Sequence, residues 1–520
     1  MREMREETTH ADGSMVLSSS TASLARGGSP APAPAPTPAA AVSGGAGSAA
    51  HAASSGALGL RGLALRRPRE LVLGRTAGRI ALATMLLGTL ALVAFASARQ
   101  GVLVPRSYLS FPPWEAGPLH FLFRGLPSDY LALNIGLSVL VPVLTLAYVA
   151  AILAVRSFSV RALVIVILAL HALLLLAPPM QLTDLFNYLG YARLGAVHHL
   201  NPYTHGISAE LHDPIFRFAS WHNLKSPYGP LFTAISYPLA LLPLPLAFWA
   251  LKVIAVLTSL AFLGLVWRGA RLLGRDPRFA LVFVALNPIY IVYALGGFHN
   301  DFFMLIPSMA AIVLLLERRD GAAGAALMFA VAVKFTAVLL LPFLLIAARP
   351  PERRLRVLTG AVLAAIPLAA GSIALFGFTL PNLSDQSTLL TDLSVPNLVG
   401  IAIGAGGGTP AVLRVANVLL VLVVIYCLRR QREWLAGAGW STLALIASLA
   451  WLVPWYILWV LPLAALASSV RLRRAALAFT VFLVLTFLPE TGVVLINHGF
   501  NPMGSPVGQA SKALQRRLAG

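Results

Sequence analysis

Residues 163–179 read LVIVILALHALLLLAPP, and residues 181–203 read QLTDLFNYLGYARLGAVHHLNPY. The first run is apolar and long enough to cross a membrane, since a spanning helix needs about 20 apolar residues, with a range of about 17–25. The second run begins the longest polar interruption between two apolar runs, which extends to residue 230. This junction predicts a membrane-spanning helix followed by a loop that gathers an acid, aromatic rings and bases at one membrane surface.

The composition places the whole chain among membrane proteins. Of its 520 residues, 58% are hydrophobic and only 11% are charged, whereas soluble domains have about 25% charged residues. The net charge is +20, but the basic residues stand in short clusters between apolar runs, where they orient a membrane protein. Because no recognition motif accompanies the charge, we predict no nucleic-acid partner. The single cysteine, Cys427, provides neither a disulfide framework nor a thiolate metal site.

The apolar runs predict an all-α polytopic membrane protein with about thirteen membrane segments. Arginines before residue 80 place the N-terminus in the cytoplasm, and the polar stretch 181–230 then lies outside the cytoplasm. Residues 231–246 contain three prolines and are predicted to be re-entrant. The predicted segments are residues 80–98, 130–155, 163–179, 247–267, 279–295, 302–316, both halves of a short hairpin at 322–348, 357–376, 412–428, 435–452, 457–469 and 475–488.

The chain divides into three predicted parts. Residues 1–60 are rich in Ala, Pro, Gly and Ser, a composition that buries no core and predicts a disordered cytoplasmic arm. Residues 61–490 form the transmembrane domain, and residues 491–520 form an extracytoplasmic C-terminal tail. The predicted location is the plasma membrane, as a multi-pass protein whose large outer loops carry the functional residues.

The polar stretch after residue 180 contains the leading catalytic candidate. If residues 182–195 are helical, Asp184, Asn187, Tyr188 and Tyr191 share one face. An amide and two phenols beside an acid suit a sugar, whose hydroxyls need hydrogen-bond partners and whose ring packs on aromatic surface. The carboxylate could accept the proton of an attacking hydroxyl. The alternative interpretation makes Asp184 a helix-terminal charge or a partner of Arg193.

Two more polar positions fall on the same predicted side. His299, Asn300 and Asp301 form a compact turn between two segments, either because a turn needs polar residues or because Asp301 meets a lysine or a phosphate. Lys334 is the only charged residue between Gly321 and Arg349. Its ammonium either snorkels to the interface or binds a lipid-linked phosphate at headgroup level.

Two adjacent histidines, His198 and His199, are interpreted as polar residues at the membrane interface, with phosphate binding as the alternative. Adjacent residues of a regular helix do not converge on one ligand, and a zinc site needs three or four converging ligands. We therefore predict no metal site and no cofactor, and divalent-metal dependence stays open.

Several short motifs, taken in order, resemble one known family. They are TDLFNYLGYARL from Thr183, NPY from Asn201, SPYGPL from Ser226, GGFHND from Gly296, AVAVKFTAVLLLPFLL from Ala330, LLTDLSVPNLVG from Leu389 and PWYILWVLPLAAL from Pro454. Together they cover roughly residues 80–500 and resemble the membrane glycosyltransferases of the C fold class (GT-C). More narrowly, they resemble the actinobacterial α-(1→6)-mannosyltransferases that use polyprenyl-phosphate mannose.

This resemblance implies a GT-C-like fold and an inverting mannosyltransferase with Asp184 as catalytic base. The implied donor is polyprenyl-phosphate mannose, and the implied acceptor is an α-(1→6)-mannan of the lipomannan type on a lipid anchor. For the donor phosphate we predict Lys334, His299 and Arg193. The predicted sugar and acceptor ligands are Asn187, Tyr188, Tyr191, Tyr228, Asp301, Asn397, Trp455 and Tyr456. In many such enzymes the catalytic acid follows the first span, whereas here it follows the third.

Two other functions compete with this one. A transporter or flippase of a lipid-linked sugar would place ionisable residues at the bilayer midplane and would show repeated halves. A non-catalytic envelope scaffold would need no acid, base and aromatic set on one side. The outward clustering of the polar candidates favours the enzyme.

Overall fold

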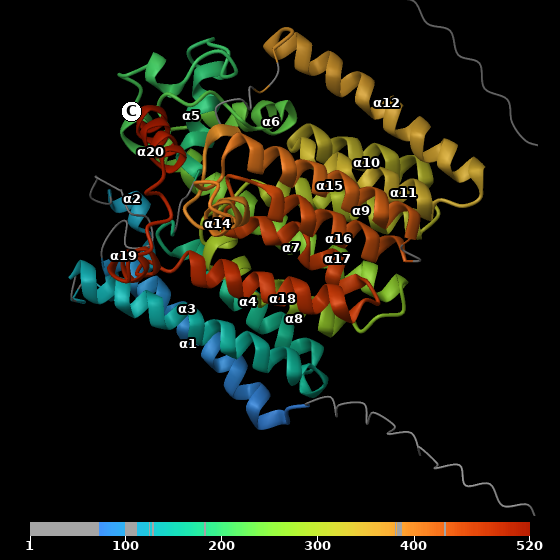
Figure 1. The fold of residues 1–520 in the computed structure, drawn as a ribbon, viewed down its shortest axis with the longest axis horizontal. Helices are drawn as coiled ribbons and strands as arrows, with labels where there is room; N and C mark the ends of the chain where they lie inside the picture. The colour runs from blue at the N-terminus through green and yellow to red at the C-terminus, as the bar shows by residue number, and fades with distance from the viewer. Residues whose placement is uncertain are drawn as a thin grey trace, which may run out of the picture. The chain divides into compact units, whose positions relative to one another are not determined.

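The structure, a computed structural model, describes residues 72–98, 112–123, 125–126, 129–180, 184–379, 381, 387–430 and 433–520. Within these ranges the chain is helical and has no strand (Figure 1). The predicted cytoplasmic arm, residues 1–60, lies outside the described residues. In chain order the α-helices are α1 (Arg75–Ala98), α2 (Pro113–Ala116), α3 (Tyr130–Leu153), α4 (Val160–Leu176), α5 (Leu185–Ala196), α6 (Pro230–Ala240), α7 (Leu244–Leu272), α8 (Pro277–Ala285), α9 (Asp301–Leu316), α10 (Asp320–Val333), α11 (Leu341–Ala347), α12 (Pro351–Phe376), α14 (Val395–Ala402), α15 (Pro410–Arg430), α16 (Trp434–Ser448), α17 (Leu461–Leu466), α18 (Val470–Thr486), α19 (Thr491–Asn497) and α20 (Pro506–Ala519).

Several of these helices have the length and composition of membrane spans. In the described part of the chain, 5 helices qualify, namely α1, α3, α7, α12 and α15, and α18 with α19 forms a sixth candidate bent by 72°. Shorter apolar helices, among them α4, α9, α10 and α16, pack with them. These helices support a multi-pass membrane protein, while the count of about thirteen segments stays a prediction.

Two predicted segments are divided differently in the structure, and proline accounts for both differences. The break between α6 and α7 lies at residues 241–243 rather than at residue 246, because Pro245 is accommodated in the first turn of α7. The predicted segment 279–295 is interrupted: α8 ends at Ala285, and after Pro288 the chain continues as a π-helical turn, Tyr290–Leu295. A proline disfavours the helical conformation of the residue before it.

The chain reverses direction at Lys334. Arg353 and Arg356, in the first turns of α12, pair with Asp320, the first residue of α10, at 2.6 and 3.1 Å. The two helices therefore start at the same end and run parallel. The return path is a 3-10 helix at Phe335–Leu340 followed by α11. Because α9 ends just before α10 begins, the start of α9 and the end of α10 lie at the opposite end from these arginines.

The predicted C-terminal tail contains two helices, α19 and α20. Figure 1 shows α20 beside the loop that connects α5 and α6. The backbone N–H of Asn223 in that loop donates to the Leu518 carbonyl at 3.0 Å, and the Ser511 hydroxyl accepts from the Leu390 N–H at 2.8 Å. The C-terminal helix thus joins the two loops that follow α5 and α12.

Candidate active site

Asp184 and His299 face each other across two separate segments. Asp184 directly precedes α5, its side chain makes no capping hydrogen bond to that helix, and it is 23% exposed. Nδ1 of the buried His299 lies 3.7 Å from Oδ2 of Asp184. The imidazole stacks on Trp455, with ring centroids 3.6 Å apart and planes inclined by 15°. The indole therefore fixes the plane of the ring that faces the carboxylate.

The backbone of the GGFHND motif explains how His299 reaches this place. Phe298 adopts a left-handed φ of 53°, a conformation that is unusual for a bulky residue. A side chain at Gly297 would come within 2.6 Å of Nε2 of His299 and of the Tyr293 carbonyl. The turn thus requires glycine next to a tightly packed histidine.

Lys334 reaches the same turn from the end of α10. Its Nζ donates to Oδ1 of Asp301 at 2.8 Å, and the same oxygen accepts from Nε1 of Trp459 at 2.6 Å. The ammonium also lies 5.4 Å from the ring centres of both Tyr456 and Trp459. The lysine side chain is 17% exposed, so a partly accessible cation is held beside two aromatic faces.

Two tyrosines complete the wall next to Asp184. The Tyr188 hydroxyl accepts a hydrogen bond of 3.0 Å from the backbone N–H of Asn300, and its ring meets that of Tyr228 edge-on at 4.9 Å. Burial raises the pKa of Tyr228 well above its usual range, and the Asp184 carboxylate adds to this rise. The phenol therefore stays protonated and can donate a hydrogen bond.

Several buried polar atoms in this turn have no hydrogen-bond partner among the described residues. They are Nδ1 and Nε2 of His299, Nδ2 of Asn300 and Oδ2 of Asp301. Leaving a buried polar group unsatisfied costs about 1–3 kcal/mol, so folded proteins contain few of them. Four such atoms within three consecutive residues leave this turn with hydrogen-bonding capacity that the described residues do not use.

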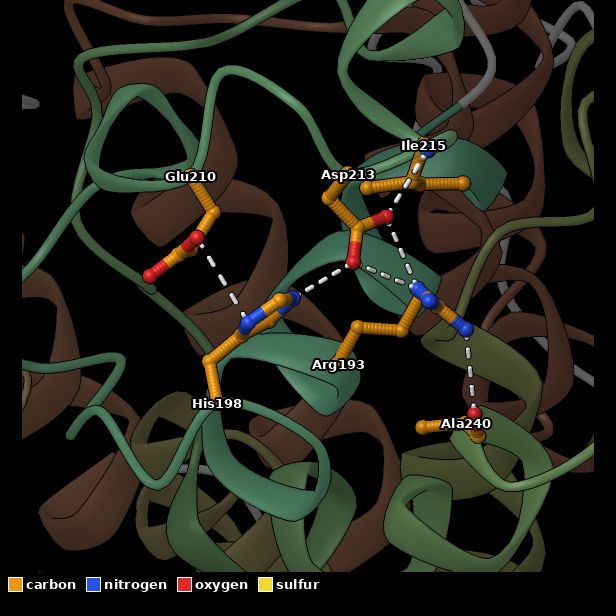
Figure 2. Close-up of polar contacts among 6 residues, drawn as sticks. All are labelled: Arg193, His198, Glu210, Asp213, Ile215 and Ala240. Carbon is orange, nitrogen blue, oxygen red and sulfur yellow. Dashed lines mark hydrogen bonds and ion pairs between the residues drawn. The ribbon is translucent and has the colours of Figure 1, made fainter.

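Arg193, which was predicted to bind phosphate, lies in a different polar group (Figure 2). Its Nε donates to both oxygens of Asp213 at 2.8 and 2.9 Å, and Nη1 donates to the Ala240 carbonyl at 3.2 Å. His198 contacts the same carboxylate at 2.6 Å through Nε2. Burial opposes ionisation of Asp213, but hydrogen bonds from Arg193 and His198 outweigh it and hold the pKa below its ordinary value. Arg193 thus pairs with Asp213 and not with Asp184.

Three other predicted ligands hold neighbouring backbone in place. The Asn187 amide accepts from the Ser220 N–H and donates to the Trp221 carbonyl at 3.0 and 3.2 Å. The Tyr191 hydroxyl donates to the Leu224 carbonyl, and Asn397 bonds the backbone at positions 392, 408 and 502. The structure brings together Asp184, Tyr188, Tyr228, His299, Asp301, Lys334, Trp455 and Tyr456.

An apolar groove begins next to this cluster. Trp459, whose indole bonds Asp301, lines its upper part, and the groove follows α9 from Met304 to Ile312. It is small, with a cavity volume of about 30 Å³. The other lining residues come from the return path after Lys334, from α16 and from α17, and include Ala337, Leu340, Leu445 and Leu463. Trp459 thus stands between a polar, cationic cluster and a small apolar groove.

Sequence reasoning missed Trp459 as a site residue. The motif from Pro454 contains it, but nothing in the spacing showed that its indole would reach Asp301. Among the described residues, no group of three or more His, Cys, Asp or Glu side chains could hold a metal ion.

In this all-helical membrane fold, a carboxylate, a histidine and a lysine lie together among aromatic rings, and such groups can accept a proton and bind a sugar. Two family models match the chain: residues 77–349 match the N-terminal domain of alpha-(1->6)-mannopyranosyltransferase, and residues 391–503 match the MptB C-terminal domain. The chain therefore belongs to the α-(1→6)-mannopyranosyltransferase family, as the sequence motifs indicated.

Two relatives of known name agree with this membership. The chain is 29% identical over 376 residues to alpha-(1->6)-mannopyranosyltransferase A of Mycobacterium tuberculosis, covering 64% of this chain and 70% of the relative. It is 27% identical over 364 residues to the protein of the same name from Corynebacterium glutamicum, covering 60% and 73%. No solved structure matches the chain. These relationships support a glycosyltransferase that transfers mannosyl groups.

Proposed function

We propose that this protein is an inverting mannosyltransferase that moves mannose from polyprenyl-phosphate mannose to an α-(1→6)-mannan acceptor of the lipomannan type outside the plasma membrane. Family membership supports the mannosyl transfer. The observation that carries the rest is the placement of Asp184 against His299, bordered by unpartnered buried polar atoms and by Lys334. The site offers a base, sugar-binding groups and a cation within one cluster.

Asp184 is the proposed general base. Its carboxylate accepts the proton of the acceptor hydroxyl while the hydroxyl oxygen attacks the anomeric carbon of mannose. The bond from that carbon to the phosphate oxygen breaks on the opposite face, so a β-linked donor gives an α product and free polyprenyl phosphate. General-base assistance of this kind typically contributes roughly 10² to 10⁴ in rate.

Lys334 is the proposed partner of the leaving phosphate. Negative charge grows on the phosphate as the bond breaks, and a cation already in position stabilises it without reorganisation. The contacts of Lys334 with Asp301, Tyr456 and Trp459 hold the ammonium at the edge of the cluster. His299 and Asn300, with their unsatisfied nitrogens, are proposed to contact the sugar or the phosphate. Arg193 remains a weaker candidate, because its guanidinium is occupied by Asp213.

The apolar groove supports a lipid-linked donor. It begins at Trp459, next to the Lys334–Asp301 pair, and its lining is almost entirely hydrocarbon. An amphiphile with its phosphate at Lys334 could place its hydrocarbon chain along this apolar lining. A water-soluble sugar nucleotide would gain nothing from this groove.

The distribution of charge supports an extracytoplasmic site. Asp301 and Lys334 lie where α9 starts and α10 ends, whereas Arg318, Arg319 and Arg353 lie at the other end of these helices. Basic residues between membrane segments favour the cytoplasmic side. The cluster would therefore face outward, where an envelope mannan is available.

A membrane assay tests the proposal. Membranes that contain the protein are given a panel of polyprenyl-phosphate sugars and mannan acceptors, and the product linkage is determined. We expect α-(1→6)-mannosyl product from the mannose donor, and a loss of about 10²–10⁴ in kcat for Asp184→Asn. Asp392→Asn, an exposed acid of another loop, is the matched control and should leave kcat unchanged. Full activity of Asp184→Asn would overturn the base assignment, and donor translocation without product would favour the flippase alternative.

A further inference from the structure

Lys252 is a fully buried lysine in the interior of the long helix α7. An ionisable side chain inside an apolar membrane helix is costly to bury, and such residues are usually functional. Its Nζ donates a hydrogen bond of 2.7 Å to the Ala177 carbonyl. It is not among the residues proposed to meet donor or acceptor, so its contacts indicate what else it does.

The first contact leads to Asp184. Ala177 is the residue at which α4 ends, and the chain continues from there to Asp184. Along this path the Met180 N–H donates to the Gly296 carbonyl at 2.9 Å. The described part of the chain that leads toward the proposed base, which ends at Met180, is therefore anchored to Lys252 and to the turn that carries His299.

The second contact leads to His299. The ammonium lies 4.9 Å from the ring centre of Phe298, 4.2 Å from that of Trp249 and 5.2 Å from that of Phe248. Phe298 is the buried residue with the left-handed backbone, and it immediately precedes His299. Attraction between a desolvated cation and an aromatic face holds this ring in place. One side chain thus contacts both the end of α4, which precedes Asp184 in the chain, and the residue that directly precedes His299.

A buried carboxylate lies in the stretch between α1 and α3. Glu115, in the short helix α2, is 3% exposed, and its Oε2 has no hydrogen-bond partner among the described residues. Burial raises the pKa of Glu115 to about 7, and the Lys252 charge opposes this rise. The α2 segment is attached to α7 through Nε1 of Trp249, which donates to the Trp114 carbonyl at 2.8 Å.

We propose that Lys252 is a positioning residue that aligns Asp184 with His299, and that Glu115 of the first outer loop neutralises it. This inference rests on the proposed function, because Asp184 and His299 are the groups it aligns. It also gives a role to α1 and α3, the two helices that precede the segment leading to Asp184. These helices flank the segment that carries Glu115, and the charge of this carboxylate would offset the energetic cost of burying Lys252.

Two variants separate positioning from charge burial. Lys252→Met keeps the length of the side chain but leaves Glu115 buried without its counter-charge, so we expect a lower Tm and a lower kcat. The double variant Glu115→Gln/Lys252→Met removes both charges and should recover the Tm, since losing a whole buried pair is far less harmful than losing one partner. Its kcat should remain about 10–100-fold below wild type, the effect of a small misalignment, with the KM for donor unchanged.

The measurements are the Tm of the purified protein in detergent and the kcat and KM with polyprenyl-phosphate mannose. Lys225→Met, an exposed lysine of the loop after α5, is the matched control and should change neither. A wild-type kcat in the double variant would overturn the positioning role. Lys252 would then be only a buried charge that Glu115 neutralises. Asp184→Asn in the same preparation tests the proposed function separately, because full activity there overturns the base assignment alone.

Discussion

Lys334 and Asp301 form an ion pair of 2.8 Å between the end of α10 and the start of α9. The two residues are 33 positions apart in the chain, and Trp459 joins them through its hydrogen bond to the same carboxylate. The pair occupies only one oxygen of Asp301, and the other is unpartnered among the described residues. The ion pair therefore orients the lysine and leaves acceptor capacity for a ligand.

Lys334→Ala should impair the use of the donor and leave the binding of the acceptor unchanged. If the ammonium binds the donor phosphate and stabilises the charge that develops on it, its removal costs a charge-assisted hydrogen bond of about 1.5–3 kcal/mol, which corresponds to a fall of roughly 10- to 150-fold in kcat/KM for the donor. The KM for the mannan acceptor should stay unchanged. Initial rates with each substrate varied in turn measure this, and equal effects on both substrates would contradict phosphate binding.

Trp455→Ala should lower kcat by releasing the imidazole of His299. The stacked pair, with centroids 3.6 Å apart, is worth about 0.5–1.5 kcal/mol beyond its buried area, so we expect a decrease of about 2- to 13-fold. Trp455→Phe keeps an aromatic face and should retain more activity than the alanine variant. Single-turnover rates at saturating donor make the comparison, and identical rates for both variants would argue against the stack as the cause.

Gly297→Ala should reduce activity through a clash, because the added Cβ would lie 2.6 Å from Nε2 of His299. The matched control is Gly264→Ala in α7, where a Cβ meets no atom within 4 Å and the helix gains up to about 1 kcal/mol from the better helix former. Activity and Tm of both variants test the contrast. A fully active Gly297→Ala would show that the turn can relax.

Low pH should remove the stability that the ionised Asp213 gains from Arg193 and His198. A carboxyl whose pKa is lower in the folded protein stabilises the fold above its unfolded pKa of about 3.9, and this stabilisation is lost as the pH falls through the folded value. Asp213→Asn should therefore lower the Tm at neutral pH, where Arg193 and His198 lose their partner. The Tm difference between wild type and variant should shrink below about pH 4. A difference that is constant with pH would exclude the ionised carboxylate as its source.

The sequence predicted the membrane class, the helix after Asp184 and the reversal near Lys334, because these depend on local composition and spacing. Apolar runs of sufficient length must avoid water, and a lone lysine between two apolar runs marks a place where the chain can turn. The motifs also led to the correct family. The roles of Asp184 and of the other site residues stay predictions for the variants to test.

Only the tertiary structure decided which polar residues meet. Arg193 and Asp184 lie on one short stretch, yet the arginine turns to Asp213, while Asp184 faces His299 from a segment more than a hundred residues away. Trp459 and Lys252 stood in the sequence as an ordinary aromatic and a lone charge inside an apolar run. Their partners, Asp301 and Ala177, are fixed by helix packing. Periodicity within one helix determines the face on which a side chain lies, whereas the partner across that face depends on how all the helices assemble.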